Sequence, residues 1–181
     1  MENSEESNLN CKSSGCCSTE KKEKQAKRVF IEYLYLDHQT CDRCIGTDKI
    51  LDEVVESLTP ALRLAGYELS YDKVEIATKE LAVKNKMLSS PTIRVNGRDI
   101  CQNTLENDCA CCGEISGTEV LCRVFEYNGV SYEVPPPEML AEAILRNVFC
   151  PSGSECCCGE YRLPKNLQSF FAGKESREIE K

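Results

Sequence analysis

The stretch from Val29 to Gly66 constrains the fold more than any other part of the sequence. Residues 29–36 are almost continuously apolar and rich in β-branched and aromatic side chains, which predicts a strand covered on both faces. A polar loop follows, and Thr40 is the expected N-cap of a long amphipathic helix with Gly66 at its C′ position. Residues 67–76 have the pattern of a second strand, and the resulting βαβ unit requires these two strands to be parallel.

A Cys-x-x-Cys pair, Cys41 and Cys44, falls in the first turn of this predicted helix. Residues three apart share a helical face, and the positive end of the helix dipole favours a thiolate over a thiol. We expect Cys41 to be the more exposed and more acidic sulfur, with Cys44 behind it as the resolving thiol. Half of a structural zinc site is the alternative, but a position between a buried strand and a helix favours a redox-type motif.

The composition limits where the protein works and what it binds. A formal charge of −8, with no long basic run, argues against nucleic acid or an anionic membrane as a partner. No apolar run approaches the ~18 residues that a spanning helix needs, and the polar N-terminus lacks a secretory signal pattern. We therefore expect a cytoplasmic protein whose 14 cysteines are ligands or redox groups. With a single histidine, any metal site must be mostly thiolate, which selects soft ions.

Two Asn-Gly pairs predict tight turns in the second half of the chain. The first pair, at 96–97, ends a short strand that begins after Pro91, and the second, at 128–129, is the turn of a hairpin. A short helix is expected at 79–88, and a last helix follows the prolines at 135–137.

Residues 101–122 interrupt this pattern with five cysteines and weak apolar periodicity, so we expect a loop-like insertion. The candidate metal ligands are Cys109, Cys111, Cys112 and Cys122. Their spacing is not that of a zinc ribbon with two separated Cys-x-x-Cys pairs. Three interpretations stay open: a structural zinc site, a functional site for a soft ion or metalloid beside Cys41 and Cys44, and a second dithiol that exchanges electrons with that pair.

Two tails are expected to flank a single domain at residues 29–149. Residues 1–28 are polar and charged, which predicts disorder, and residues 150–181 are expected to be mostly flexible. The second tail nevertheless contains side chains that could dock on the core: Tyr161, Leu163, Leu167, Phe170 and Phe171. Both tails contain clustered cysteines, which either bind a large soft ion or form a thiol reserve with no dedicated role. These are Cys11, Cys16, Cys17, Cys156, Cys157 and Cys158.

The predicted β-α-β-α-β-β-α order, with Cys41-x-x-Cys44 at the first helix and Pro91 opening the third strand, resembles the thioredoxin-like fold. This resemblance implies a mixed central sheet flanked by helices and a cis Ser90–Pro91 bond whose backbone borders a substrate groove. A closer similarity, over about residues 29–149, is to a bacterial family with a thioredoxin-like core that is known as a domain of unknown function. Its motifs here are TCDRCIGT, SSPTIRVNGRDI, ENDCACCGE, CRVFEYNG and YEVPP. The similarity implies the fold and no particular activity, and the cysteine-rich insertion departs from ordinary thioredoxins.

The sequence thus predicts an α/β, thioredoxin-like protein with dithiol/disulfide chemistry at Cys41 and Cys44, with Pro91 beside them. Cys41 attacks a disulfide or a thiophilic adduct, and Cys44 resolves the mixed species, leaving a Cys41–Cys44 disulfide. That step needs an external thiol reductant and no cofactor, and whether the protein turns over as a thiol-disulfide oxidoreductase is left open. The alternative function is a carrier or binding protein for a soft ion such as arsenite, mercury, copper or zinc. The sequence does not predict the oligomeric state.

Overall fold

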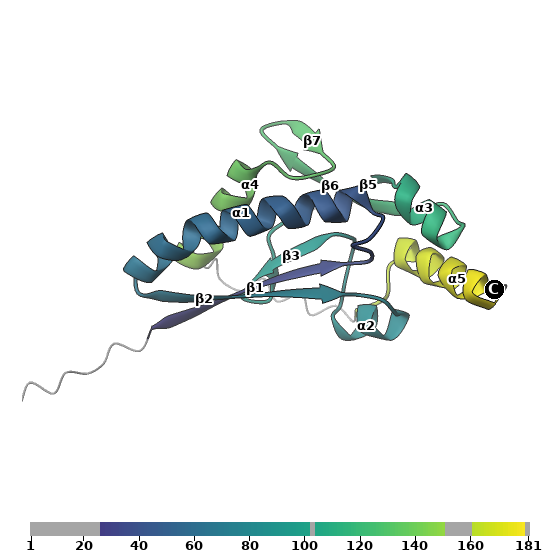
Figure 1. The fold of residues 1–181 in the computed structure, drawn as a ribbon, viewed down its shortest axis with the longest axis horizontal. Helices are drawn as coiled ribbons and strands as arrows, with labels where there is room; N and C mark the ends of the chain where they lie inside the picture. Colours follow the sequence, from purple (N-terminus) through teal and green to yellow (C-terminus); the bar gives the residue numbers. More distant parts are fainter. Residues whose placement is uncertain (1–25, 102–103, 151–160, 180–181) are drawn as a thin grey trace, which may run out of the picture.

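The computed structural model describes residues 26–101, 104–150 and 161–179, and these residues form two sheets and five helices (Figure 1). The strands are β1 (Lys27–Tyr35), β2 (Tyr67–Glu75), β3 (Thr92–Val95), β4 (Arg98–Asp99), β5 (Leu105–Asp108), β6 (Leu121–Tyr127) and β7 (Val130–Tyr132). The helices are α1 (Asp42–Leu64), α2 (Lys79–Lys84), α3 (Ala110–Ser116), α4 (Pro137–Phe149) and α5 (Lys165–Ile179).

The larger sheet has the strand order β2-β1-β3-β4. Strand β1 pairs in parallel with β2, from Lys27 opposite Tyr67 to Tyr35 opposite Glu75, and antiparallel with β3. The predicted parallel βαβ unit and the mixed central sheet are therefore confirmed. The first strand begins earlier than predicted, because Lys27 and Arg28, expected in the N-terminal tail, pair with β2.

The prediction that β1 is covered on both faces is wrong for most of its length. Helices α1 and α4 cover the face that carries Val29, Ile31 and Tyr33, and all three are buried. On the other face Phe30 is 47% exposed. That face is covered only at the end of the strand, where Leu34 joins a second core that includes residues of α2, α3 and α5.

The cysteine-rich segment is not a loop-like insertion. Within residues 101–122, β5 pairs antiparallel with β6, the seven-residue helix α3 follows β5, and β6 continues into the hairpin with β7. Three of its buried side chains, Cys109, Cys112 and Cys122, are cysteines, which the sequence pattern presents as candidate ligands and not as core residues.

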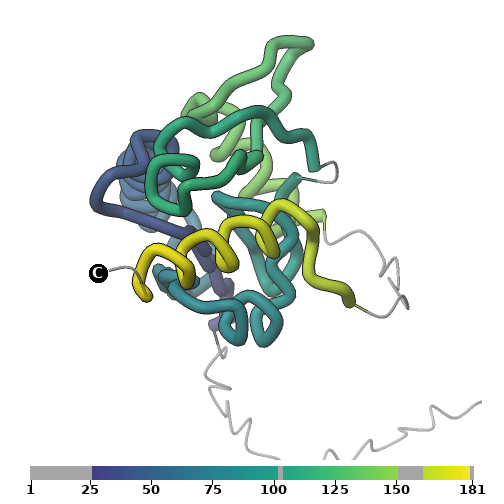
Figure 2. The backbone as a smooth tube through the Cα atoms, turned by 90° about the vertical axis from the view of Figure 1, so that its right-hand side faces the viewer, coloured from purple at the N-terminus to yellow at the C-terminus, as the bar shows by residue number. Residues whose placement is uncertain are grey.

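The C-terminal segment packs on the core where flexibility was the main expectation. Helix α5 buries Leu167, Phe170 and Phe171, which confirms the alternative that these side chains dock. Figure 2 shows α5, in yellow, crossing the end of the molecule that contains α2 and α3. The approach to α3 is close, because a side chain at Gly173 would collide with the carbonyl of Ser116.

Several local predictions are confirmed. Both Asn-Gly turns have the left-handed backbone that they require, with φ of 52° at Asn96 and at Asn128. Gly66 follows the C-cap of α1 with φ of 83°. The Ser90–Pro91 bond is cis. No helix in the described ranges is both long enough and apolar enough to span a membrane.

Part of the two tails lies outside the described residues. The predicted disorder of residues 1–25 falls there, and so do six cysteines of the tails: Cys11, Cys16, Cys17, Cys156, Cys157 and Cys158.

Candidate metal-binding thiol cluster

The loop before α1 is organised by Asp37 and not by Thr40. The Oδ1 atom of Asp37 accepts hydrogen bonds from the N–H groups of Gln39, Thr40 and Cys41, at 3.2, 2.7 and 2.9 Å, and from the Thr40 hydroxyl at 2.8 Å. Cys41 is the N-cap residue, and its side chain makes no capping hydrogen bond. Burial acts to raise the pKa of Asp37, but these hydrogen bonds outweigh it and hold the pKa below its usual value. Asp37 therefore acts as the capping group of this loop.

Replacing Asp37 with alanine is expected to lower the free energy of unfolding by about 1–2 kcal/mol, the range for losing a strong helix cap. Urea denaturation followed by circular dichroism measures this. Asp37→Asn keeps an acceptor oxygen in the same place, so it should cost clearly less. Equal losses in the two variants would show that the hydrogen bonds to Oδ1 do not stabilise this loop.

Cys41 and Cys44 do not differ in exposure, because both side chains are completely buried. The prediction that Cys41 is the more exposed and more acidic sulfur is therefore wrong. The pKa of Cys41 is raised, first by its hydrogen bond with Cys109, whereas the pKa of Cys44 is lowered, first by its hydrogen bond with Cys41. Cys44 and not Cys41 has the lowered pKa because the thiols that surround Cys41 come from distant residues. Cys112, for example, is 71 residues away in the sequence.

Three sulfur atoms from two separate elements meet in the interior. The Sγ atoms of Cys41, Cys109 and Cys112 all lie within 4.8 Å of one another, and each residue is at most 5% exposed. Cys41 is the N-cap of α1, Cys109 is the N-cap of α3, and Cys112 lies in the first turn of α3. The Sγ atoms of Cys41 and Cys112 are 3.9 Å apart. This trio, called the thiol cluster below, joins one cysteine of the Cys-x-x-Cys pair to two of the predicted ligands.

The two other predicted ligands have different positions. The Sγ atom of Cys122, on β6, lies 3.4 Å from that of Cys112, next to the thiol cluster but outside the group of three. Cys111 is only partly buried and packs against the surrounding core without joining the group. Helical geometry explains the difference, since Cys109 and Cys112 are three residues apart and share a face, whereas Cys111 points elsewhere.

Four neighbouring thiols, those of Cys41, Cys109, Cys112 and Cys122, shift one another's pKa values through hydrogen bonds. Hydrogen bonds from Cys112, Cys122 and Cys41, in decreasing order, hold the pKa of Cys109 below its ordinary value. The pKa values of Cys112 and Cys122 are both raised, first by their hydrogen bonds with Cys109. These opposite shifts have one physical cause: a negative charge on one of these buried sulfurs makes a second one nearby costly.

Cys44 lies next to Ser90, the residue that precedes the cis proline. Its Sγ atom lies 3.6 Å from the hydroxyl of Ser90, which is itself 3.3 Å from the N–H of Leu36. Its carbonyl accepts a hydrogen bond of 2.7 Å from the buried hydroxyl of Tyr33. The carbonyl of Ser90 accepts from the N–H of Arg123 at 2.7 Å, so β6 lies against the residue that precedes Pro91.

Arg43, between the two cysteines of the pair, was not among the predicted site residues. Its side chain is 5% exposed and donates to the carbonyls of Cys122, Arg123 and Asp108, at 3.0, 3.3 and 3.2 Å. It also pairs with Glu133 at 2.7 Å. The start of α1 is thereby fixed to β5 and β6, which places Cys41 against the cysteines of the second sheet. No local pattern indicates this role, because the carbonyls come from residues far away in the sequence.

His38, Arg94 and Arg123 each have a structural partner. His38 lies 2.8 Å from Asp48, and the Arg94 guanidinium donates to the carbonyl of Lys86. Arg123 is fully buried and pairs with both carboxylate oxygens of Asp99, at 2.7 and 2.8 Å. Arg123 is therefore part of a buried ion pair and not an exposed charge at the edge of a strand.

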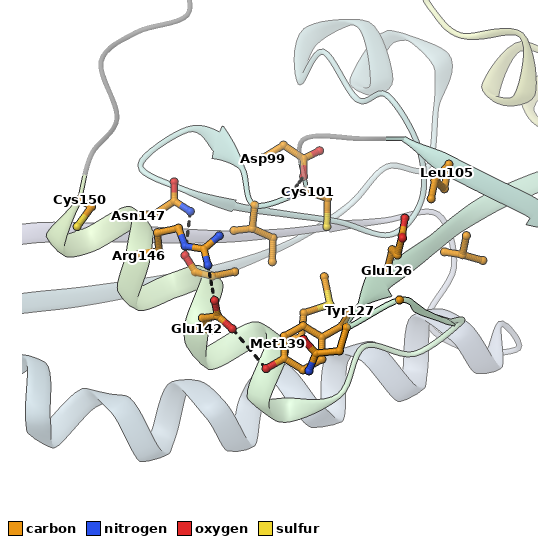
Figure 3. Close-up of a pocket in the computed structure, with 15 residues that line it drawn as sticks. Asp99, Cys101, Leu105, Glu126, Tyr127, Met139, Glu142, Arg146, Asn147 and Cys150 are labelled. Carbon is orange, nitrogen blue, oxygen red and sulfur yellow. Dashed lines mark hydrogen bonds and ion pairs between the residues drawn. The ribbon is translucent and has the colours of Figure 1, made fainter.

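A separate pocket of about 480 Å³ lies between β6 and α4 (Figure 3). Asp99, Cys101, Glu126, Tyr127 and Glu142 are among its lining residues, and no member of the thiol cluster is. Glu142 is engaged by Tyr127 and Arg146. Burial raises the pKa of Cys101 to about 11, so this thiol is a poor nucleophile at neutral pH.

Comparison with known proteins gives a family and no function. A family model described as a domain of unknown function, DUF2703, matches residues 29–144, which is well over half of the chain. All three members of the thiol cluster lie inside the matched segment. No curated protein matches the chain, and no solved structure does.

Proposed function

The chain belongs to the DUF2703 family, and we propose that it binds a soft thiophilic ion in the thiol cluster. The observation that carries this proposal is the convergence of three buried sulfur atoms within 4.8 Å of one another. With metal–sulfur bonds of about 2.3 Å, three sulfurs around one ion are roughly 3.8–4.0 Å apart. Closing the cluster on an ion therefore requires a contraction of at most about 1 Å. Thiolate ligands select soft ions over magnesium or calcium.

Neighbouring thiols raise the pKa of Cys41, but its place at a helix N-terminus lowers the cost of the thiolate form that an ion would bind. Cys41 caps the N-terminus of α1, a helix of 23 residues, where the helix dipole favours negative charge. We place this chemistry in the cytoplasm, because a reducing compartment keeps thiols available as ligands.

A thioredoxin-like core is the finer description of the fold that we propose. The elements β1-α1-β2-α2-β3 follow the order expected from the sequence, and α4 follows the expected hairpin, β6-β7. The Cys-x-x-Cys pair at the start of α1 and Pro91 directly before β3 support the same description.

Dithiol/disulfide exchange is the second candidate function. It is favoured by Cys44, whose pKa is lowered and whose sulfur is adjacent to the Ser90 hydroxyl. In this reaction the Cys41 thiolate attacks a substrate disulfide and releases one substrate thiol. Cys44 then displaces the second substrate thiol and forms the Cys41–Cys44 disulfide, which an external thiol reduces. Complete burial of Cys41 argues against attack on a macromolecular disulfide, so we rank ion binding first.

The decisive experiment is a Cd2+ titration of the reduced full-length chain, with the six clustered tail cysteines (Cys11, Cys16, Cys17, Cys156, Cys157 and Cys158) replaced by serine. Bound metal is counted by elemental mass spectrometry after gel filtration. We expect one ion per chain, and Cys112→Ser should weaken binding by at least about 100-fold, beyond the usual effect of losing an outer-shell partner.

Cys111→Ser is the matched control, because Cys111 neighbours Cys112 on α3 but lies outside the thiol cluster. Ion binding is refuted if Cys112→Ser binds Cd2+ as well as Cys111→Ser does. Dithiol turnover that is lost in Cys41→Ser but kept in Cys112→Ser would instead establish the exchange reaction.

A further inference from the structure

We infer that the ion bound by the thiol cluster is a trivalent metalloid, arsenic(III) or antimony(III), held by Cys41, Cys109 and Cys112. This inference rests on the proposed ion-binding function and adds the class of ion. Two features of the site lead to it: the net charge that its surroundings tolerate, and the number of sulfur atoms that converge.

The surroundings of the thiol cluster are apolar. The cysteines share one core with Leu34, Leu36 and Ile76, and with Phe170 and Phe171 of α5. All of these side chains are at most 2% exposed. A net charge in such surroundings is expensive unless another charge offsets it.

The two buried arginines of this region are already neutralised. Arg43 pairs with Glu133 at 2.7 Å, and Arg123 pairs with Asp99 through two contacts of 2.7 and 2.8 Å. Their charges are therefore balanced by carboxylates before any ion arrives. A neutral complex is the one that fits this interior.

Counting charges separates the classes of soft ion. Three thiolates carry three negative charges, so a trivalent ion gives a neutral complex, a divalent ion leaves one negative charge, and copper(I) leaves two. Zinc in a four-thiolate site leaves two. Mercury(II) is neutral with only two thiolates, which leaves one sulfur of the trio unused.

The number of sulfurs agrees with the charge count. Arsenic(III) and antimony(III) form three single bonds on one side and keep a lone pair on the other. Cys41, Cys109 and Cys112 supply three sulfurs that all lie within 4.8 Å of one another. Cys122 neighbours Cys112 and Cys109 but lies outside this group of three. A trigonal site therefore fits the geometry without a fourth ligand.

The binding step balances without electron transfer. Arsenous acid, As(OH)3, meets three thiols; three As–S bonds form while three As–O and three S–H bonds break, and three water molecules leave. Arsenic stays trivalent and the sulfurs stay reduced, so no oxidant or reductant is needed.

Intact-mass spectrometry of the reduced full-length chain, with the six clustered tail cysteines replaced by serine, tests the inference with arsenite as the probe. A three-thiol adduct adds one arsenic and loses three hydrogens, whereas a two-thiol adduct retains a hydroxyl group on arsenic. We expect the three-thiol mass, and conversion to a weaker two-thiol adduct in Cys41→Ser, Cys109→Ser and Cys112→Ser. Cys111→Ser and Cys122→Ser should keep the three-thiol mass.

Competition with Cd2+ distinguishes failure of this inference from failure of the proposed function. We expect one equivalent of arsenite to displace bound Cd2+. If Cd2+ binds but arsenite neither displaces it nor gives the three-thiol adduct, the inference is overturned and ion binding stands. If the three-thiol adduct requires Cys122, the assigned ligand set is wrong. If neither ion binds, both proposals fall.

Discussion

Replacing Arg43 with methionine is expected to lower the free energy of unfolding by roughly 3–5 kcal/mol, as for other broken buried charge networks. The guanidinium donates to three backbone carbonyls, those of Cys122, Arg123 and Asp108. Without it, the carbonyls of Cys122 and Arg123 lose a buried donor, and each unsatisfied buried group costs about 1–3 kcal/mol. Urea denaturation monitored by circular dichroism measures the loss.

Glu133→Gln is the control for Arg43→Met. Glu133 is 60% exposed, and its removal breaks the ion pair but leaves the carbonyl contacts in place. A loss of about 1 kcal/mol or less is expected, as for exposed ion pairs. If Glu133→Gln destabilises the protein as much as Arg43→Met does, the ion pair and not the carbonyl contacts holds α1 to the second sheet.

The second large effect is expected on removing Phe170 from α5. This side chain is fully buried in the core that contains the cysteines, and Phe→Ala changes in such places cost about 3–5 kcal/mol. Because α5 packs on α3, loosening it should also expose the thiol cluster. In the background without the clustered tail cysteines, Phe170→Ala should therefore accelerate modification of Cys41 and Cys112 by a thiol reagent, measured by peptide mass mapping.

Glu175→Ala provides the comparison within the same helix. Glu175 is exposed, so its replacement should change stability by no more than about 0.5 kcal/mol and leave thiol modification slow. Unchanged modification rates in Phe170→Ala, despite lower stability, would show that α5 does not limit access to the cysteines.

Local patterns predicted the first half of the fold well. The apolar run of β1, the helical periodicity of α1 and Gly66 at its C′ position specify the βαβ unit with little help from the rest of the chain. The Asn-Gly turns were equally predictable, because the left-handed backbone at Asn96 and Asn128 is a property of the turn itself.

The second sheet and the site could be predicted only in part. Cys109 and Cys112, taken as buried apolar side chains, give residues 109–116 a helical face, but cysteine is both a ligand and a core residue. The meeting of Cys41 with Cys112 depends on Arg43 and on carbonyls of β5 and β6, which are long-range contacts that no local pattern encodes. The burial of Cys41 depends on the same packing.

The proposed ligands and the side chains that cover them lie in different segments of the chain. The three proposed ligands lie within the family segment at residues 29–144, whereas the aromatic side chains that cover them come from residues 165–179. For the proposed ion, the residues that determine affinity and the residues that determine the rate of entry thus lie in different stretches of the sequence. Substitutions in α5 can change how fast an ion enters or leaves without altering a single bond to it, so exchange rate and equilibrium binding are free to evolve independently.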